Sequence, residues 1–231
     1  MTTTLITGAN KGIGRETARR LVEAGQDVWL GARDSAAGQA AAEALGARFV
    51  QLDVTDDASV AAAVQTIRAA GTGLDVLINN AGVGGAVRSV PETTVDDLAA
   101  VFDTNVFGIV RVTRAFLPLL EASENPVIVN VSSGLGSLTR TNDPERAEGR
   151  FTALDYPSSK AAVTMLTSQY ARALPGFRVN AADPGYTATD LNGNSGTQTV
   201  TEGTDAIVAL AQIGADGPTN TFTDRHGVVP W

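Results

Sequence analysis

Cysteine is absent from the 231 residues of this chain, and histidine occurs once. Without cysteine the protein forms no disulfide bonds, which suits a reducing compartment, and we expect a cytoplasmic location. Most transition-metal sites depend on cysteine and histidine ligands, so we expect no metal site. The one histidine, His226, stands close to the end of the sequence, where we expect a solvated side chain.

Long apolar segments are missing as well. No run approaches the ~18 residues that a membrane-spanning helix needs. The first residues, MTTTLITG, lack the basic stretch and apolar core of a secretion signal. The formal net charge of -8 opposes binding to a phosphate backbone, and no basic patch interleaved with aromatic residues offsets it. We therefore expect neither a membrane nor a nucleic acid among the partners.

Strand-like and helix-like segments alternate along the whole chain. The apolar residues of the strand-like segments run together, as expected for a sheet that is covered on both faces. This alternation predicts right-handed βαβ units and an α/β fold with a doubly wound parallel sheet. No linker, repeat or low-complexity tract divides the sequence, so we expect a single domain over residues 1–231. The predicted strands are 3–7, 27–32, 48–53, 75–80, 126–132, 177–183 and, as a seventh, 220–225; the predicted helices are about 13–25, 35–45, 56–70, 94–121, 157–174 and 202–213.

Two segments interrupt the alternation. Residues 134–155 are polar, mixed in charge and without a helical stripe, and residues 187–199 are rich in Gly, Thr and Asn. A loop as long as the first one usually has a function or is disordered. We expect both segments to border a substrate pocket, whose walls would come from Val83–Val90, 134–155 and Tyr186–Gln198.

The first predicted strand leads into TGANKGIG, residues 7–14, which has glycine at positions 8, 12 and 14. Glycine lets the backbone turn sharply and approach a pyrophosphate, and the N-terminus of the following helix favours the negative charge. Because the motif follows a strand and opens a helix, it indicates a dinucleotide-binding loop.

The end of the second predicted strand indicates which dinucleotide binds. NAD sites usually place an acidic residue there to hold the ribose 2′-hydroxyl, whereas this chain has Ala32 followed by Arg33. A guanidinium binds phosphate oxygens well, and Lys11 in the glycine loop adds a second cation. The two cations favour NADP(H), while Asp34, which follows directly, would neutralise part of their charge.

Polar and small residues follow the next two strands. Asp53 closes the third strand, where its carboxylate could accept a hydrogen bond from the adenine edge. Asn80, Ala81 and Gly82 follow the fourth strand and would leave room for a cofactor ribose.

Residues 156–160 read YPSSK, and Lys160 is one of only two lysines among the 17 basic residues. Pro157 fits the first turn of a helix, so Tyr156 lies at the helix start and Lys160 one turn later on the same face. An ammonium group near a phenol favours the phenolate, so we expect Lys160 to lower the pKa of Tyr156. The compact ammonium can also bind ribose hydroxyls, which explains why lysine rather than arginine stands here.

Two further polar positions belong with this pair. A strand that ends in NVSSG, residues 130–134, precedes the YPSSK helix. Ser133 could donate a hydrogen bond to a substrate carbonyl oxygen while Tyr156 delivers a proton. Asn105 lies inside a predicted helix although asparagine is a mediocre helix former, which indicates a polar role.

Taken together, these segments resemble the short-chain dehydrogenase/reductase family, in the family's order and over roughly residues 3 to 230. NNAG (79–82) resembles its fourth-strand motif, and DPGYTATD (183–190) resembles the segment that contacts the nicotinamide. The resemblance implies a Rossmann-type sheet of about seven strands and hydride transfer at the nicotinamide. The implied catalytic residues are Asn105, Ser133, Tyr156 and Lys160. The implied cofactor contacts are Gly8, Asn10, Lys11, Gly12, Ile13, Gly14, Arg33, Asp53, Val54, Asn80, Ala81, Gly82, Tyr156, Lys160, Pro184, Gly185 and Thr187.

The resemblance also implies a role for each catalytic residue. Tyr156 would be the general acid in reduction or the base in alcohol oxidation, and Lys160 would lower its pKa and bind the ribose. Ser133 would orient the substrate oxygen. Asn105 would hold a water that links Lys160 to solvent. The combination of Arg33 with the lysine of the glycine loop resembles NADPH-preferring carbonyl reductases.

One feature departs from many members of the family, because 23 positions separate Ser133 from Tyr156. The extra residues resemble the insertion of carbonyl reductases, which in some members covers the usual helix-pair interface and leaves a monomer. Both a monomer and a homo-oligomer therefore stay open.

We expect an NADPH-dependent reductase that converts a small or medium aldehyde or ketone into an alcohol. An NAD-linked alcohol dehydrogenase is one alternative. The other is a non-catalytic module that senses NADP and signals through a partner. Sensors on this fold commonly lack the tyrosine or the lysine, whereas this chain has both Tyr156 and Lys160, which favours the enzyme.

Overall fold

An eight-stranded sheet forms the centre of the protein in the computed structural model, which describes residues 1–86 and 88–231. The strand order is β3-β2-β1-β4-β5-β6-β7-β8, and every neighbouring pair up to β7 is parallel. The predicted doubly wound sheet is confirmed. The unexpected eighth strand has two residues and pairs antiparallel with β7 at the edge. The strands are β1 (Thr3–Thr7), β2 (Asp27–Ala32), β3 (Arg48–Gln51), β4 (Val76–Asn79), β5 (Val127–Val131), β6 (Arg178–Ala182), β7 (Phe222–Asp224) and β8 (Gly227–Val228).

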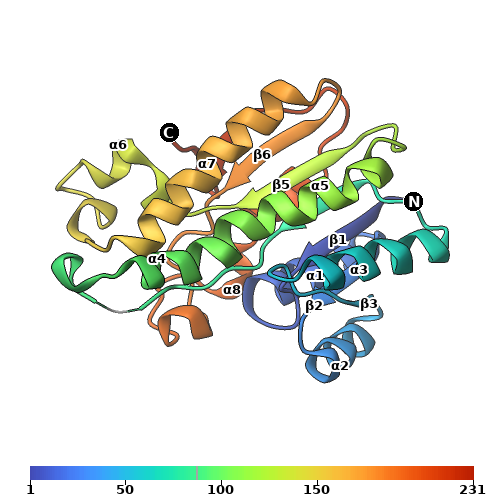
Figure 1. Ribbon diagram of the computed structural model, residues 1–231. Helices are drawn as coiled ribbons and strands as arrows, with labels where there is room; N and C mark the ends of the chain where they lie inside the picture. Colours follow the sequence, from blue (N-terminus) through green and yellow to red (C-terminus); the bar gives the residue numbers. More distant parts are fainter. Residues whose placement is uncertain (87) are drawn as a thin grey trace.

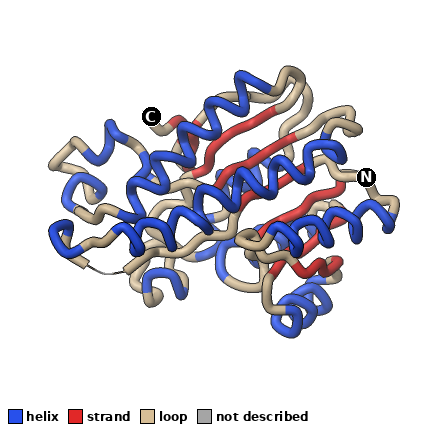
Figure 2. Tube along the Cα trace, in the orientation of Figure 1, coloured by secondary structure: helices blue, strands red, loops and turns tan. Residues whose placement is uncertain are grey.

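Helices cover both faces of the sheet, which explains the continuous apolar runs of the strands (Figures 1 and 2). In β1, Leu5 and Ile6 are fully buried in two different hydrophobic clusters, one on each face. The first cluster includes side chains of α1 (Gly12–Glu23), α2 (Ser35–Leu45) and α9 (Asp205–Ala211). The second includes side chains of α3 (Asp57–Ala70), α5 (Gly108–Leu120) and α7 (Asp155–Ala173).

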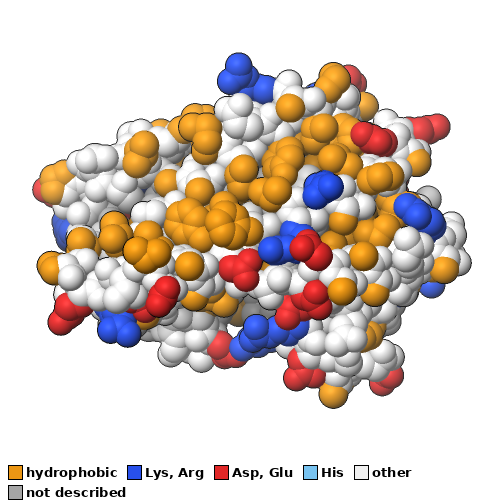
Figure 3. All heavy atoms as spheres, viewed as in Figure 1, with side chains coloured by type: hydrophobic (Ala, Val, Ile, Leu, Met, Phe, Trp, Pro, Cys, Tyr) orange, Lys and Arg blue, Asp and Glu red, His pale blue; other side chains and the backbone are white. Residues whose placement is uncertain are grey.

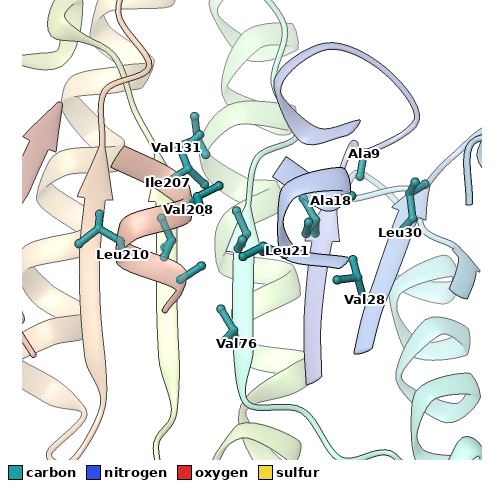
Figure 4. Packing of buried hydrophobic residues seen from close by; sticks show 14 of the residues in the cluster. Ala9, Ala18, Leu21, Val28, Leu30, Val76, Val131, Ile207, Val208 and Leu210 are labelled. Carbon is teal, nitrogen blue, oxygen red and sulfur yellow. The ribbon is translucent and has the colours of Figure 1, made fainter. Parts of the chain in front are cut away.

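Figure 4 shows the first of these clusters from close by. In this cluster, Leu21 of α1 and Ile207 of α9 cover the face of the sheet to which Val76 of β4 and Val131 of β5 belong. Full burial of a Leu, Ile or Val side chain stabilises a fold by roughly 1.5–3 kcal/mol. The two clusters together therefore hold the helices against the sheet.

The single helix predicted over residues 94–121 is divided in the structure. α4 (Val95–Phe102) begins at a capping box formed by Thr94 and Asp97, and α5 follows a π-helical turn, η2 (Asp103–Phe107). A π turn widens the helix by one residue and often marks a functional site. Asn105 lies in this turn and is buried, and its side chain accepts a hydrogen bond from the Val83 N–H.

The helix predicted over residues 202–213 is also divided, into α8 (Val200–Gly203) and α9. Arg20 of α1 donates hydrogen bonds to the Thr201 carbonyl and to Thr204 Oγ1, and so attaches α1 to the turn between these two helices.

The segment 134–155, predicted to be a loop, contains three short helical turns. They are η3 (Gly134–Gly136), α6 (Leu138–Thr141) and η4 (Glu148–Arg150), and the segment forms a lobe beside the start of α7 (Figure 1). Arg140 of α6 is largely buried and forms ion pairs with Asp183, Asp224 and Glu148. These contacts hold the segment against the ends of β6 and β7.

Two shorter turns complete the chain, η1 (Val90–Glu92) and η5 (Asp190–Asn192). In the described ranges, none of the helices combines the length and the apolar character needed to cross a bilayer. Apolar side chains gather on the face that α4, α5 and α7 present in Figure 3. α5 and the residues around it carry the exposed Phe107 and Val110, and α7 carries the exposed Met165.

A buried polar network joins two helices to the centre of the sheet. Asn79 of β4 donates to Asn130 of β5 at 2.9 Å and to Thr113 of α5 at 3.1 Å. Asn130 in turn donates to Thr167 of α7 at 2.9 Å. All four side chains are buried, so each depends on the others for its hydrogen bonds.

Replacement of Asn130 by alanine should therefore destabilise the protein by about 1 to 3 kcal/mol, because Asn79 and Thr167 each lose one buried hydrogen bond. Urea unfolding measures the change. Thr66→Ala is the control, since Thr66 is exposed on α3 and bonds only within its own helix turn. Equal stability of the two variants would contradict this account of the network.

Candidate functional site

A cavity of about 460 Å³ opens at the carboxyl ends of the strands, beside β1. The strand order changes direction here, because β2 pairs with one edge of β1 and β4 pairs with the other. In open α/β sheets this switch point is where ligands bind. The wall contains every residue that we expected to contact a cofactor except Gly185 and Thr187. Six further wall residues belong to the segments expected to border the pocket: Val83, Ala188, Thr189, Asp190, Leu191 and Asn194. The sequence did not single out the others, which are Leu52, Thr55, Thr104, Val131, Ser132 and Val200.

The glycine loop is fixed to the end of β4. Gly8 has φ +63°, and a Cβ atom there would lie 2.9 Å from Ala81 Cα, so only glycine fits. Asn80 Nδ2 donates to the carbonyls of Thr7 and Gly8, at 2.8 and 3.1 Å. Thr7 Oγ1 accepts from the backbone N–H groups of Asn80 and Ala81. Residues 80–82 therefore hold the glycine loop in place, in addition to the room for a cofactor ribose that we expected from them.

Where β2 and β3 end, the cavity wall contains the cation Arg33 and the carboxylate of Asp53. Arg33 is exposed in the wall. Asp34, its neighbour, accepts from the Ala37 N–H at 3.0 Å and caps α2. Hydrogen bonds from Thr55 hold the pKa of Asp53 below its ordinary value, and the charge of Arg33 adds to this effect. Asp53 is therefore an ionised acceptor at neutral pH.

Lys11, the second expected cation, pairs with Asp190 at 3.0 Å. Both side chains are about two-thirds exposed, at 66% and 65%, so water competes strongly with the pair. Exposed pairs of this kind stabilise a fold by at most about 1 kcal/mol, and Lys11 can exchange its partner easily. The contact joins the glycine loop to the segment 187–199, which forms part of the opposite wall.

Gly185 and Thr187 lie behind the wall and shape it. Gly185 has φ +67° and packs against Gln198. Thr187 is buried, and its hydroxyl donates to the Pro184 carbonyl at 2.8 Å. The turn that these residues form presents Pro184 to the cavity.

Tyr156 stands in the wall at the start of α7 and is partly exposed. Burial raises the pKa of Tyr156 to about 12, although a hydrogen bond with Ser133 opposes the shift. The expectation that Lys160 lowers this pKa is wrong for the structure. Lys160 Nζ lies 5.6 Å from the centre of the tyrosine ring and is directed to a carbonyl, so desolvation of the phenol dominates.

Lys160 is only 5% exposed, and its Nζ donates to the Val131 carbonyl at 2.9 Å. Burial lowers the pKa of Lys160 to about 8, and the negative charge of Asp183 partly opposes the shift. The amine is therefore still protonated at neutral pH, but it loses its proton more easily than an exposed lysine does.

The two serines at the end of β5 point in different directions. Ser133 forms the hydrogen bond with Tyr156 and accepts from the Leu135 N–H at 3.2 Å. Ser132 is buried, and its hydroxyl donates to the backbone carbonyl of Lys160 at 3.1 Å. Ser132 thus holds α7 against β5, and Ser133 faces Tyr156.

Asn105 lies behind the wall and connects three parts of the site. Its Oδ1 accepts from the Val83 N–H at 2.8 Å, and its Nδ2 donates to the Val83 carbonyl and to Ser159 Oγ, both at 3.0 Å. A Cβ atom on Gly82 would lie 3.4 Å from Asn105 Oδ1 and 3.7 Å from Lys160 Nζ. Asn105 and Lys160 therefore flank the same glycine.

The chain was compared with families of known proteins. A family model described as short chain dehydrogenase matches residues 2–199, which include the glycine loop, Asn105, Ser133, Tyr156 and Lys160. The chain belongs to the short-chain dehydrogenase family. It is an oxidoreductase of this family, whose members bind a nicotinamide cofactor.

Relatives in the short-chain dehydrogenase family cover nearly the whole chain. A (+)-neomenthol dehydrogenase from Capsicum annuum is 31% identical over 302 residues, covering 97% of this chain and 96% of the relative. The alignment is longer than the 231 residues of the chain, so the relative carries segments that this chain lacks.

Solved structures of similar proteins agree with the fold. The structure of NADPH-bound carbonyl reductase from chicken fatty liver superposes with a TM-score of 0.87 at 29% identity, over 100% of this chain and 99% of the other. The structure of salutaridine reductase from Papaver somniferum gives 0.85 at 28% identity, over 97% and 100%. The single-domain Rossmann-type fold is thereby confirmed.

The sequence analysis did not predict the ion pair between Asp183 and Arg140, which lies near the site. Asp183 is 3% exposed, accepts from the Gly185 N–H at 2.9 Å and pairs with Arg140 at 3.0 Å. Burial raises the pKa of Asp183, and Arg140 opposes the shift. Asp183 was part of the DPGYTATD segment, but nothing in the sequence indicates that an arginine 43 positions earlier neutralises it.

The buried Lys160 predicts a pH effect on stability. The pKa of Lys160 is lower in the folded state than in the unfolded state, so unfolding takes up a proton between about pH 8 and the ordinary lysine range. The stability of the wild type should therefore rise with pH relative to Lys160→Met, by on the order of 2 kcal/mol between pH 7 and pH 10. Chemical unfolding at several pH values, without cofactor, measures the difference. A difference that stays constant over this range would show that burial does not perturb the amine.

Proposed function

We propose that the protein is an NADPH-dependent reductase that converts an aldehyde or ketone into an alcohol, with Tyr156 as the proton donor. The observation that carries the proposal is the position of Tyr156 and Lys160, which share one cavity wall with the glycine loop and with Arg33. A bound nicotinamide, a substrate oxygen and a proton donor can then meet in one place.

The residues of the cavity suit a phosphorylated dinucleotide. The positive φ of Gly8 and its close approach to Ala81 leave a bare backbone turn at the start of α1, where a pyrophosphate binds well. Asp53 would accept from the adenine, and Arg33 would bind a 2′-phosphate. Bound NADPH would supply a hydride to the substrate carbonyl carbon.

The state of Tyr156 supports reduction. Because its pKa is raised to about 12, the phenol carries its proton at neutral pH and can donate it to the substrate oxygen. The hydrogen bond from Ser133 would orient the same oxygen beside the phenol. Lys160, whose amine lies 5.6 Å from the centre of the tyrosine ring, would bind a cofactor ribose beside the phenol.

The names of the relatives support a carbonyl or alcohol substrate. A neomenthol dehydrogenase, a salutaridine reductase and a carbonyl reductase are among the proteins similar to this chain. Leu191 lines the cavity wall opposite the glycine loop, and Phe151 and Leu154 are exposed just before Tyr156. We propose that these apolar side chains, in the segments 134–155 and 187–199, border an apolar substrate. Of the proposed wall Val83–Val90, Val87 lies outside the described residues.

Tyr156→Phe tests the proposal most simply. Loss of the proton donor should lower turnover of a ketone or aldehyde by on the order of 10²–10⁴-fold, while the dissociation constant of NADPH stays unchanged. Oxidation of NADPH, followed by its absorbance, measures turnover, and nicotinamide fluorescence measures binding.

Tyr170→Phe is the matched control, since Tyr170 lies on the same helix and packs against the hydrophobic core. This variant should retain wild-type turnover. If Tyr156→Phe also retains it, another group donates the proton and the proposed mechanism is wrong.

Arg33→Ala tests the cofactor preference. Removal of a charge-assisted hydrogen bond of roughly 1.5–3 kcal/mol should weaken NADPH binding by on the order of tenfold to a hundredfold and leave NADH binding unchanged. Arg48→Ala is the control, because Arg48 is exposed at the other end of the β2–β3 pair, where it binds Asp27. Equal losses for both cofactors would mean that Arg33 does not select the phosphate.

A further inference from the structure

Tyr156 is held through its backbone by side chains on both sides. Its N–H donates to Asp155 Oδ1 at 2.7 Å, and its carbonyl accepts from Ser159 Oγ at 2.7 Å. Ser159 in turn accepts from Asn105, which also binds both backbone groups of Val83. The Tyr156 carbonyl is therefore connected, through Ser159 and Asn105, to the loop that follows β4.

Asp155 connects the other side to the same loop. Its second oxygen, Oδ2, accepts from the Ala86 N–H at 3.1 Å, three residues beyond Val83. The Asp155 side chain is only 2% exposed. The loop 83–86 is thus attached to the start of α7 twice, by Asn105 at Val83 and by Asp155 at Ala86.

The backbone of the loop is shaped to receive this carboxylate. Gly85 has φ +82°, and a Cβ atom there would lie 2.1 Å from Asp155 Oδ2 and 3.0 Å from a methyl group of Val101. Only glycine allows the loop to pass between Asp155 and α4. A negative charge in the first turn of α7 is also favoured by the helix dipole.

We propose that Asp155 is a positioning residue, which fixes the proton donor Tyr156 relative to the loop 83–86 on the substrate side of the cavity. The proposal rests on the function proposed above, in which Tyr156 donates the proton. Each carboxylate oxygen has a separate task, one at Tyr156 and one at Ala86. An amide has one acceptor oxygen, so Asp155→Asn can keep only one of the two contacts and places an N–H donor opposite the other.

Asp155→Asn should therefore release the loop from the catalytic helix without emptying the cofactor site. Misplacement of a reacting group by about 1 Å can lower a rate by on the order of 10²-fold. We expect kcat for a ketone to fall by on the order of tenfold to a hundredfold, with the dissociation constant of NADPH unchanged. The solvent deuterium isotope effect on kcat should increase, because proton delivery becomes slower.

A second measurement does not need turnover. Amide hydrogen exchange, followed by NMR, should accelerate at both Ala86 and Tyr156 in Asp155→Asn. Asp155→Ser, which retains one acceptor oxygen on a shorter side chain, gives the same test if the first variant does not fold. If the wild type reduces no carbonyl compound, the proposed function fails, but the exchange at the two amides still decides whether Asp155 couples them.

Asp75→Asn is the matched control. Asp75 is half-buried at the amino edge of the sheet, where it also joins two segments by accepting from the Thr3 N–H and from Ser123 Oγ. This variant should leave kcat, the isotope effect and the exchange of Ala86 and Tyr156 unchanged. The proposal is overturned if Asp155→Asn leaves both amides and kcat unchanged, or if Asp75→Asn changes them equally.

Discussion

The contact between the ends of β1 and β4 determines the geometry of the whole site. Asn80 donates two hydrogen bonds to Thr7 there, and Gly8 lies against Ala81 with no space for a side chain. This contact fixes the glycine loop at the switch point of the sheet, with the end of β4 as its neighbour. The loop that continues from β4 then reaches Asn105 and the start of α7, so the position of the cofactor loop and that of Tyr156 are set by one strand end.

Burial explains the pKa shifts of Tyr156 and Lys160. Tyr156 and Lys160 are each shifted toward the neutral form, the phenol upward and the amine downward, because a charge is costly away from water. The buried Asp183 adds to the upward shift of the Tyr156 pKa and opposes the downward shift of the Lys160 pKa, and Arg140 pairs with this carboxylate. The segment 134–155, which supplies Arg140, therefore influences the charge of the site as well as its shape.

The sequence predicted the elements whose residues act locally. The glycine loop, the strands and the start of α7 follow from spacing and from buried apolar runs, and these were confirmed. The division of the helix over 94–121 was missed, because a π turn depends on the polar partners of Asn105 rather than on the residues beside it. The pKa of Tyr156 was predicted in the wrong direction, since the proximity of Lys160 is visible in the spacing but the burial of the phenol is not. Two partners of Arg140, Asp183 and Asp224, lie 43 and 84 positions away, and only the folded chain brings them together.

The central claim is that the cavity brings a reduced nicotinamide and a carbonyl group together beside a proton donor. A single-turnover experiment tests it most directly: the protein in excess over NADPH is mixed with a panel of cyclic and linear ketones and aldehydes, and the nicotinamide absorbance is followed. We predict that at least one carbonyl compound oxidises the bound NADPH and yields an equal amount of alcohol. Tight binding of NADPH with no oxidation by any member of a broad panel would contradict the claim and favour a cofactor-sensing role.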